Sequence, residues 1–144
     1  MEKNWFDLYR GIVMPAHCDI YGHLNVRQYS AFFDDAGWHF PAMAGLSLEA
    51  IRARGLGTVV ATLTIEFLHE IRAGQLVLIK GAVRRVGTKS FTHEMRLYEA
   101  DSMTHCATQK TVEVCFDTAA RKGVALPEDV AAKLRGIALP EERR

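Results

Sequence analysis

The second half of the chain is dominated by segments in which apolar and polar residues alternate. Between residues 59 and 67 the apolar side chains share one parity: Val59, Ala61, Leu63, Ile65 and Phe67. This alternation predicts a β-strand that is packed on one side. Further strands are predicted at residues 75–86, 90–99 and 105–117. Because strands that follow one another through short turns pair with their neighbours, we expect an antiparallel sheet.

Two of these strands have a clear apolar parity. In the 90–99 strand the apolar side chains are Phe91, Met95 and Leu97. In the last strand they are Cys106, Val112, Val114 and Phe116, and the opposite parity holds Gln109, Thr111 and Glu113. Such alternation is typical of strands that cover a core with one face.

A helical period precedes the strands. Apolar residues recur there at three- and four-residue spacing: Tyr29, Phe32, Phe33, Ala36 and Phe40. The spacing predicts one long amphipathic helix. Asn25 is a suitable N-cap, and Pro41 is expected to end the helix near His39. A helix of about 14 residues would be ~21 Å long, which is enough to lie along one face of the sheet.

Shorter elements complete the pattern. Residues 5–14 are predicted to form a first strand, and Ser47 is expected to cap a short helix that runs to Arg54. Pro127 is expected at the start of a C-terminal helix that ends before Gly136. One strand, one long helix and a run of four strands together predict an α+β fold.

Length and composition narrow the class of protein. The 144 residues suit a single domain, expected over residues 1–136, with residues 137–144 as a tail. The formal net charge of +1 argues against a nucleic-acid partner, and no apolar run is long enough to suggest a membrane partner. The three cysteines form no CxxC pair, which favours a reducing compartment, and we expect a cytoplasmic protein.

The polar segment from His17 to Asn25 concentrates side chains that take up or release protons. It holds two imidazoles, a thiol, a carboxylate and a phenol. The predicted helix begins directly after it, and the first backbone N–H groups of a helix have no partners inside the helix and favour negative charge. Asp19 beside such a helix start provides the minimum for attack on an acyl group with stabilisation of the oxyanion.

Two motifs carry a resemblance to a known family: Asp19-x-x-Gly22-His23-x-Asn25-x-x-x-Tyr29 and Phe33-Asp34-x-Ala36. They resemble those of the hotdog-fold acyl-CoA thioesterases of the 4-hydroxybenzoyl-CoA thioesterase-like family, and the predicted order of elements is similar too. The resemblance implies a hotdog fold, in which an antiparallel sheet wraps around one long central helix. It also implies hydrolysis of a short, medium or aromatic acyl-CoA to the free acid and CoA.

The resemblance assigns roles to residues around this loop. It makes Asp19 the catalytic carboxylate and the backbone N–H of Val26 the oxyanion donor. His23 and Asn25 would position the thioester or the attacking water. The other substrate-binding residues expected in this stretch are Tyr21, Gly22 and Tyr29.

Two positions depart from the family pattern. Relatives often carry Tyr, His or Asn at the position of Val26, and Arg at the position of Gly37. A backbone donor does not depend on the side chain that follows it. These departures therefore affect the expected substrate more than the expected reaction.

The resemblance also implies contacts outside the loop. Arg85, Lys89 and Ser90 are expected to lie near the phosphates of coenzyme A. The family builds its sites across subunit interfaces, so we expect a homodimer or a homotetramer. Thr62 and His69 would then face the acyl group from the neighbouring subunit.

Two chemical routes are open to Asp19. It can attack the carbonyl directly to give a mixed anhydride, or it can take a proton from water as a general base. The departing thiol has a pKa of ~8.5 and leaves without strong protonation. Neither route requires a cofactor or a metal.

Other interpretations of the same residues stay open. His17, Cys18, Asp19 and His23 would offer ligands to a metal-dependent hydrolase, although their spacing differs from the usual metal motifs. A hotdog module that binds acyl-CoA or an acyl-carrier protein without cleavage is a second alternative, and a dehydratase of 3-hydroxyacyl thioesters is a third. Structural roles are also available, with Asp19 as a turn residue, His23 as a loop hydrogen-bonding residue and Asn25 as an N-cap only.

Overall fold

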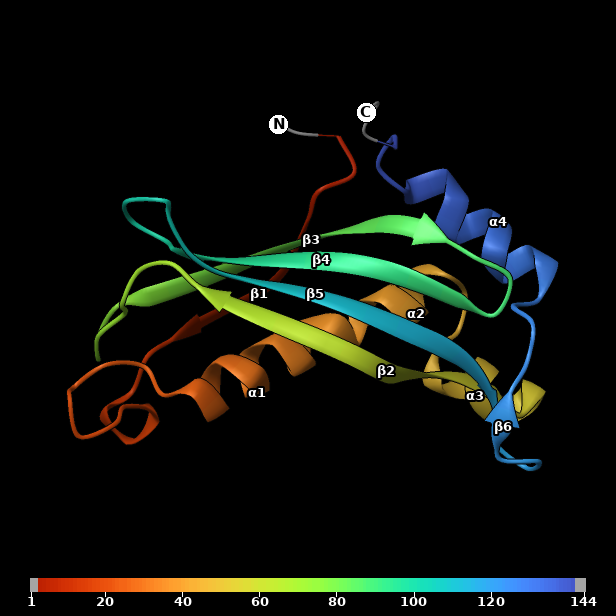
Figure 1. The fold of residues 1–144 in the computed structure, drawn as a ribbon, viewed down its shortest axis with the longest axis horizontal. Coiled ribbons are helices and arrows are strands. Elements are labelled where there is room, and N and C mark those ends of the chain that lie inside the picture. The colour runs from red at the N-terminus through yellow and green to blue at the C-terminus, as the bar shows by residue number, and fades with distance from the viewer. Residues whose placement is uncertain (1–2, 142–144) are drawn as a thin grey trace.

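The computed structural model describes residues 3–141 of the chain. Its strands are β1 (Phe6–Ile12), β2 (Leu56–Phe67), β3 (Leu76–Val86), β4 (Ser90–Glu99), β5 (Thr104–Asp117) and β6 (Lys122–Gly123). Its helices are α1 (Val26–Gly37), α2 (His39–Met43), α3 (Leu48–Arg54) and α4 (Glu128–Ile137), with a 3₁₀ turn at Pro15–His17. The sheet is antiparallel in the order β1-β3-β4-β5-β2, and β6 pairs with β5 (Figure 1).

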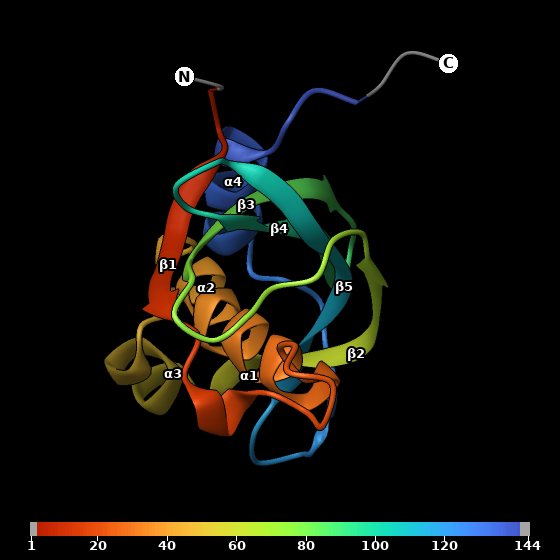
Figure 2. The ribbon, with the colours of Figure 1, turned by 90° about the vertical axis from the view of Figure 1, so that its left-hand side faces the viewer.

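The sheet curls around α1. Seen end-on in Figure 2, β1 and β2 lie at the two ends of an arch, β3, β4 and β5 lie between them, and α1 lies inside. The inward face of α1 is apolar and buried, and its buried residues are Tyr29, Phe32, Phe33 and Ala36. The predicted α+β class and the antiparallel sheet are confirmed.

The single long helix that the sequence predicts is present only in part. α1 has 12 residues and ends at Gly37, and α2 begins two residues later at His39. Pro41 has no backbone N–H and cannot bond to the carbonyl of Gly37 four residues earlier, so the helical ladder is interrupted there. No helix within residues 3–141 is long and apolar enough to cross a membrane.

The strands β4 and β5 bury different kinds of side chain on the face that meets α1. In β4 the predicted apolar parity is confirmed, since Phe91, Met95 and Leu97 are buried. In β5 the expectation holds for Cys106, which is buried, and is wrong further along, where the buried side chains are polar: Gln109, Thr111 and Glu113. The register explains this, because these three residues pair with the inward-facing residues of β4. Hydrogen bonding between strands decides which face of β5 meets α1.

The strand β2 lies at a free edge of the sheet and is exposed on both faces. A β-bulge between Val60 and Thr62 shifts the parity of its side chains halfway along. Val59, Val60, Leu63 and Phe67 are between 43% and 49% exposed. Of the predicted apolar face, Ile65 packs against the core and Phe67 meets Tyr29, so the packing of this strand on one side is present only in part within residues 3–141.

The C-terminal helix closes one end of the arch. Pro127 is its N-cap rather than its first helical residue. Arg54 of α3 donates to both carboxylate oxygens of Asp129, at 2.8 and 3.1 Å, and this contact lowers the pKa of Asp129. Within the predicted tail, the backbone N–H of Leu139 donates to the carbonyl of Val83 at 2.9 Å. Residues 142–144 of that tail lie outside the described residues.

Candidate functional site

The segment between β1 and α1 folds back on itself as a closed loop. The backbone N–H of Asp19 donates to the carbonyl of His23 at 2.9 Å, and the N–H of Gly22 donates to the carbonyl of Asp19 at 3.0 Å. Gly22 has a φ of +79°, a conformation that glycine adopts without strain. Main-chain hydrogen bonds thus hold Asp19 close to the start of α1.

One oxygen of the Asp19 carboxylate takes part in holding the loop. Its Oδ1 accepts from the backbone N–H of Tyr21 at 2.8 Å and from that of His23 at 3.4 Å. This is a usual turn function of aspartate, so the structural interpretation of Asp19 applies. Both loop bonds use Oδ1, which orients the side chain and leaves Oδ2 outside the loop's own hydrogen bonding.

The start of α1 offers a backbone donor at the predicted position. The side chain of Asn25 accepts from the N–H of Arg27 at 3.0 Å, so Asn25 is an N-cap as expected. The carbonyl of Asn25 accepts from the N–H groups of Gln28 and Tyr29. Among the residues that the structure describes, the N–H of Val26 donates to no protein acceptor. It lies at the positive end of the helix dipole.

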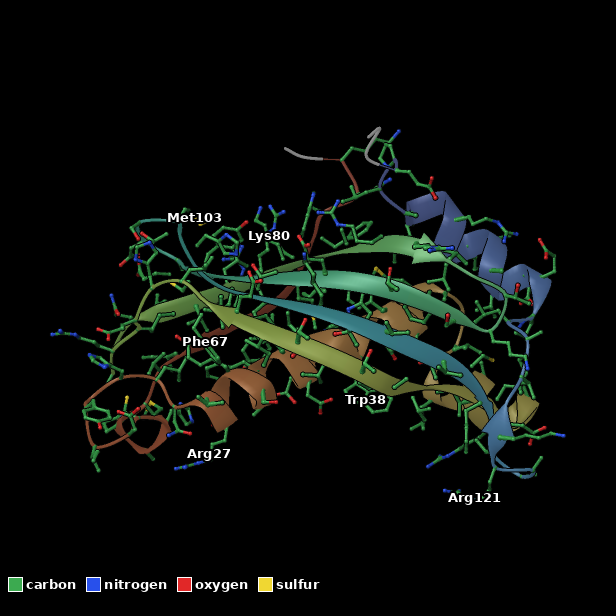
Figure 3. The ribbon with its side chains drawn as sticks, viewed as in Figure 1. Arg27, Trp38, Phe67, Lys80, Met103 and Arg121 are labelled. Atoms are coloured by element: carbon green, nitrogen blue, oxygen red, sulfur yellow. The ribbon has the colours of Figure 1, made fainter. Side chains whose placement is uncertain are left out.

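A cleft of about 340 Å³ lies between this loop and the end of β2. It is lined by six of the predicted site residues: Asp19, Tyr21, His23, Val26, Tyr29 and His69. Four further residues complete its wall, and the sequence did not single them out: Leu24, Phe67, Leu68 and Glu70. Figure 3 shows Phe67 beside the first turns of α1, and its ring meets that of Tyr29 edge-on at 5.0 Å between centroids.

Glu70 reaches the cleft through a pairing of two distant loops. The N–H of Leu24 donates to the carbonyl of Ile71 at 2.7 Å, which brings the segment after β2 alongside the Asp19 loop. Glu70 Oε2 then lies 3.1 Å from Nε2 of His23, and it orients that imidazole. The sequence offered one signal for Glu70, which is that it directly follows the predicted site residue His69. A contact between two separate loops leaves no local pattern in the sequence.

Tyr29 lines the cleft and is buried. Burial, reinforced by Cys106 and by the charge of Glu70, raises the pKa of Tyr29 to about 12. Desolvation disfavours the phenolate, so the side chain keeps its proton near neutral pH. Tyr29 is therefore a neutral group that can donate or accept a hydrogen bond.

His17 and Cys18, which precede Asp19 in the segment between β1 and α1, have packing roles. His17 Nδ1 accepts from the backbone N–H of Met14 at 3.0 Å, and its ring meets Phe32 edge-on at 5.6 Å. Cys18 is half-buried, and its thiol donates to the carbonyl of Met14 at 3.7 Å. Within residues 3–141, no group of three or more His, Cys, Asp or Glu side chains is arranged to hold a metal ion.

Three predicted CoA contacts lie far from Asp19 of the same chain. Lys89 and Ser90 follow the turn between β3 and β4, and Ser90 pairs with Val114 of β5. The cleft lies instead at the level of Ala107, which pairs with Phe67. Ala107 and Val114 are seven positions apart on β5, a distance of ~24 Å along the strand. Arg85, near the same turn, lies at the distant end as well.

Thr62 also lies away from the cleft. It pairs with Val112 and lines a groove of about 650 Å³ on the outer face of the sheet, together with Arg84, Arg85 and Lys110. Within one chain, the structure therefore separates Thr62, Arg85, Lys89 and Ser90 from Asp19.

Comparison with known families decides the classification. A model of the thioesterase-like superfamily matches residues 13–134, which is most of the chain. The chain belongs to the thioesterase-like superfamily. A search of curated proteins finds no significant match for this superfamily member.

The fold of this superfamily member is similar to those of several solved structures. A 1,4-dihydroxy-2-naphthoyl-CoA thioesterase from Synechocystis is 21% identical, with a TM-score of 0.75, and the match covers 92% of this chain and 97% of that one. A Staphylococcus aureus protein in complex with CoA is 17% identical, with a TM-score of 0.87 and coverages of 100% and 90%. The dynemicin thioesterase is 18% identical, with a TM-score of 0.78 and coverages of 92% and 96%.

At these identities the similar structures show the fold of the superfamily member, which is the hotdog fold. The resemblance drawn from the Asp19 and Phe33 motifs is thereby confirmed for family and fold. The roles of individual residues in the cleft stay predictions.

Proposed function

We propose that this protein is an acyl-CoA thioesterase that hydrolyses an acyl-CoA to the free acid and CoA. Asp19 is the proposed catalytic carboxylate, and the N–H of Val26 is the proposed oxyanion donor. One observation carries the proposal: a carboxylate fixed by its own loop lines the same cleft as a helix N-terminal N–H that has no protein acceptor among residues 3–141. The superfamily match and the similarity to a protein solved with CoA support it.

The arrangement suits the chemistry of a thioester. Asp19 either attacks the carbonyl carbon or takes a proton from the attacking water, and in both routes negative charge develops on the carbonyl oxygen. The N–H of Val26 would stabilise that charge, an effect typically of ~10² to 10³ in rate. The C–S bond then breaks, and CoA departs as a thiolate that takes up a proton. In the general-base route the free acid forms in this step, whereas in the nucleophilic route water then hydrolyses the acyl–Asp19 anhydride to the acid and the free carboxylate. His23, held by Glu70 at 3.1 Å, is proposed to position the thioester or the water.

Release of free thiol from a panel of acyl-CoA substrates tests the proposal. We expect turnover with short, medium or aromatic acyl groups, and no release when the protein is omitted or heat-denatured. Tight binding of acyl-CoA without any thiol release would favour a non-catalytic binding module and would overturn the proposal.

We further propose that two copies pair along β2. This edge strand exposes four apolar side chains, Val59, Val60, Leu63 and Phe67. Soluble monomers rarely leave such an apolar edge strand open to solvent. Antiparallel pairing about a twofold axis would place the Thr58 end of one β2 beside the Phe67 end of the other. The distant turn of the second subunit would then lie on the side of the Asp19 cleft.

Substitution of Leu63 by lysine is expected to separate the subunits, because it places like charges close to the proposed axis. The native chain should then have twice its 16.1 kDa mass in solution, and the Leu63→Lys variant should have the mass of one chain. Leu76→Lys is the matched control, since Leu76 is 46% exposed against 43% for Leu63 but lies on β3. Light scattering after gel filtration measures the masses, and a fully active native monomer would contradict the pairing.

Replacement of Arg85 or Lys89 by alanine is expected to raise KM for acyl-CoA more than for an acyl-pantetheine thioester. In the proposed dimer these cations approach the phosphates of the CoA bound at the other subunit, and the truncated substrate lacks the nucleotide. Steady-state kinetics with the two substrates measure the difference, and Arg52→Ala, an exposed cation on α3, is the control. Equal changes in KM for both substrates would place Arg85 and Lys89 away from the phosphates.

A further inference from the structure

A strip of polar side chains lies on the inner face of the sheet, under α1. It consists of Gln109, Thr111 and Glu113 on β5, with His93 on β4. His93 is 2% exposed and Glu113 is 6% exposed. Elsewhere on this face the neighbouring strand presents the apolar side chains Phe91, Met95 and Leu97. Polar groups at such positions carry a desolvation cost, so a binding role offers a reason for their presence.

Hydrogen bonds hold the strip in one arrangement. His93 Nε2 lies 2.6 Å from Glu113 Oε2, and the hydroxyl of Thr58 donates to Glu113 Oε1 at 2.9 Å. The side-chain amide of Gln109 donates to the hydroxyl oxygen of Thr111 at 3.0 Å. The ring of His93 also stacks on Phe40 at 4.1 Å between centroids. The side chains are therefore pre-oriented.

The strip forms one wall of a cavity of about 560 Å³ between α1 and β2. Its other walls carry apolar side chains, among them Ala31 and Phe33 of α1 and Val60 and Leu63 of β2. Two charged residues of α1, Arg27 and Asp34, also line the cavity. A volume of this size suits a small ligand. In Figure 3 Phe67, which lines the Asp19 cleft, lies by the start of α1, and Trp38, which lines the cavity, lies by its end. The cavity and the Asp19 cleft thus follow one another along α1 and β2.

The charged group of the strip, the carboxylate of Glu113, is an acceptor only. Each carboxylate oxygen of Glu113 has a second lone pair beyond the bond it already accepts, and the amide oxygen of Gln109 also accepts. The hydroxyl of Thr111 accepts from Gln109 and keeps a second lone pair as well as its hydrogen, and the side-chain amide of Gln109 keeps a second N–H donor. A ligand that brings a donor would match this wall, whereas a ligand that ends in a carboxylate would meet Glu113.

On the basis of the proposed thioesterase function, we propose that this cavity binds the acyl group and selects acyl chains that carry a hydrogen-bond donor, a hydroxyl or a protonated amine. The polar strip runs over five residues of β5, from Gln109 to Glu113, and the four steps between them span ~13 Å. Chains of several lengths can therefore place a terminal donor against it. Gln109, Thr111 and Glu113 are the specificity-determining residues.

Matched acyl-CoA substrates test the inference. Octanoyl-CoA is compared with its ω-hydroxy and ω-amino derivatives and with octanedioyl-CoA, and shorter and longer homologues extend the series. We expect kcat/KM to be at least ~10-fold higher for the two donor-bearing chains than for octanoyl-CoA, and lowest for the diacid. Equal values for the hydroxylated and the plain chain, or a preference for the diacid, would overturn the inference.

Variants assign the selectivity to the strip. Thr111→Val keeps the shape of the side chain and removes its hydroxyl, and Glu113→Gln removes the charge while keeping acceptor oxygen. Both should bring the ratio of hydroxyacyl to plain acyl hydrolysis, measured within each variant, to within ~3-fold of unity. Thr92→Val, on the opposite face of the sheet, is the matched control and should keep the native ratio. Should Glu113→Gln fail to fold, Thr111→Val alone decides, and an unchanged ratio in it would contradict the assignment.

A binding measurement separates this inference from the proposed reaction. S-octyl-CoA and its ω-hydroxy derivative have a thioether in place of the thioester and cannot be hydrolysed. Calorimetry on the native protein should show tighter binding of the hydroxylated compound. Absence of thiol release from every thioester would overturn the proposed hydrolysis alone, whereas equal affinities for the two thioethers would overturn the selection of donor-bearing chains.

Discussion

Replacement of Asp19 by asparagine is expected to lower kcat for acyl-CoA hydrolysis by at least ~10², with binding of the substrate largely kept. The carboxamide oxygen can still accept from the N–H groups of Tyr21 and His23, which now bond to Oδ1 at 2.8 and 3.4 Å. The loop therefore keeps its shape, and only the ionisable second oxygen is lost. Steady-state thiol release measures kcat, and equilibrium binding of S-octyl-CoA measures retention of the site.

Two further variants separate chemistry from loop structure. Asp35→Asn is the matched control, because Asp35 is an exposed carboxylate on α1 outside the cleft, and it should retain native kcat. Asp19→Ala also removes the loop acceptor and should reduce thermal stability as well as kcat. A native rate in Asp19→Asn would remove Asp19 from the mechanism.

Replacement of Phe33 by alanine is expected to lower the free energy of unfolding by ~3–5 kcal/mol. Phe33 is fully buried on the inward face of α1, and truncation of its side chain leaves a void beneath the helix that positions the Val26 N–H. Urea denaturation at a fixed protein concentration measures the change, since pairing of chains would make stability concentration-dependent.

Trp38→Ala provides the comparison for Phe33. Trp38 directly follows α1 but is 61% exposed, so its truncation should change the free energy of unfolding by only ~0.5 kcal/mol. Similar losses in the two variants would mean that Phe33 does not seat α1 against the sheet.

Features that depend on short stretches of sequence were predictable. The N-cap at Asn25 and the inward face of α1 follow from residue types at fixed spacing, and both are present. The grouping of Asp19, His23 and Val26 in one cleft also follows, because a short loop leaves few positions for these residues relative to the helix start.

Features that depend on contacts between distant segments were not predictable. Glu70 reaches His23 only because two loops pair, and Phe67 reaches Tyr29 only because β2 runs back along α1. The inward orientation of Glu113 follows from its register against β4, which outweighs the preference of a polar side chain for solvent. Sequence alternation specifies two faces of a strand, and pairing with neighbours decides which face is buried.

The most direct measurement of the central claim is a crystal structure of the Asp19→Asn variant with an unhydrolysed acyl-CoA bound. We predict that the thioester lies in the cleft beside the start of α1, with its carbonyl oxygen ~2.7–3.1 Å from the backbone nitrogen of Val26. The side chain at position 19 should lie beside the carbonyl carbon or the attacking water. A thioester bound elsewhere, with its carbonyl away from α1 and from residue 19, would contradict the account.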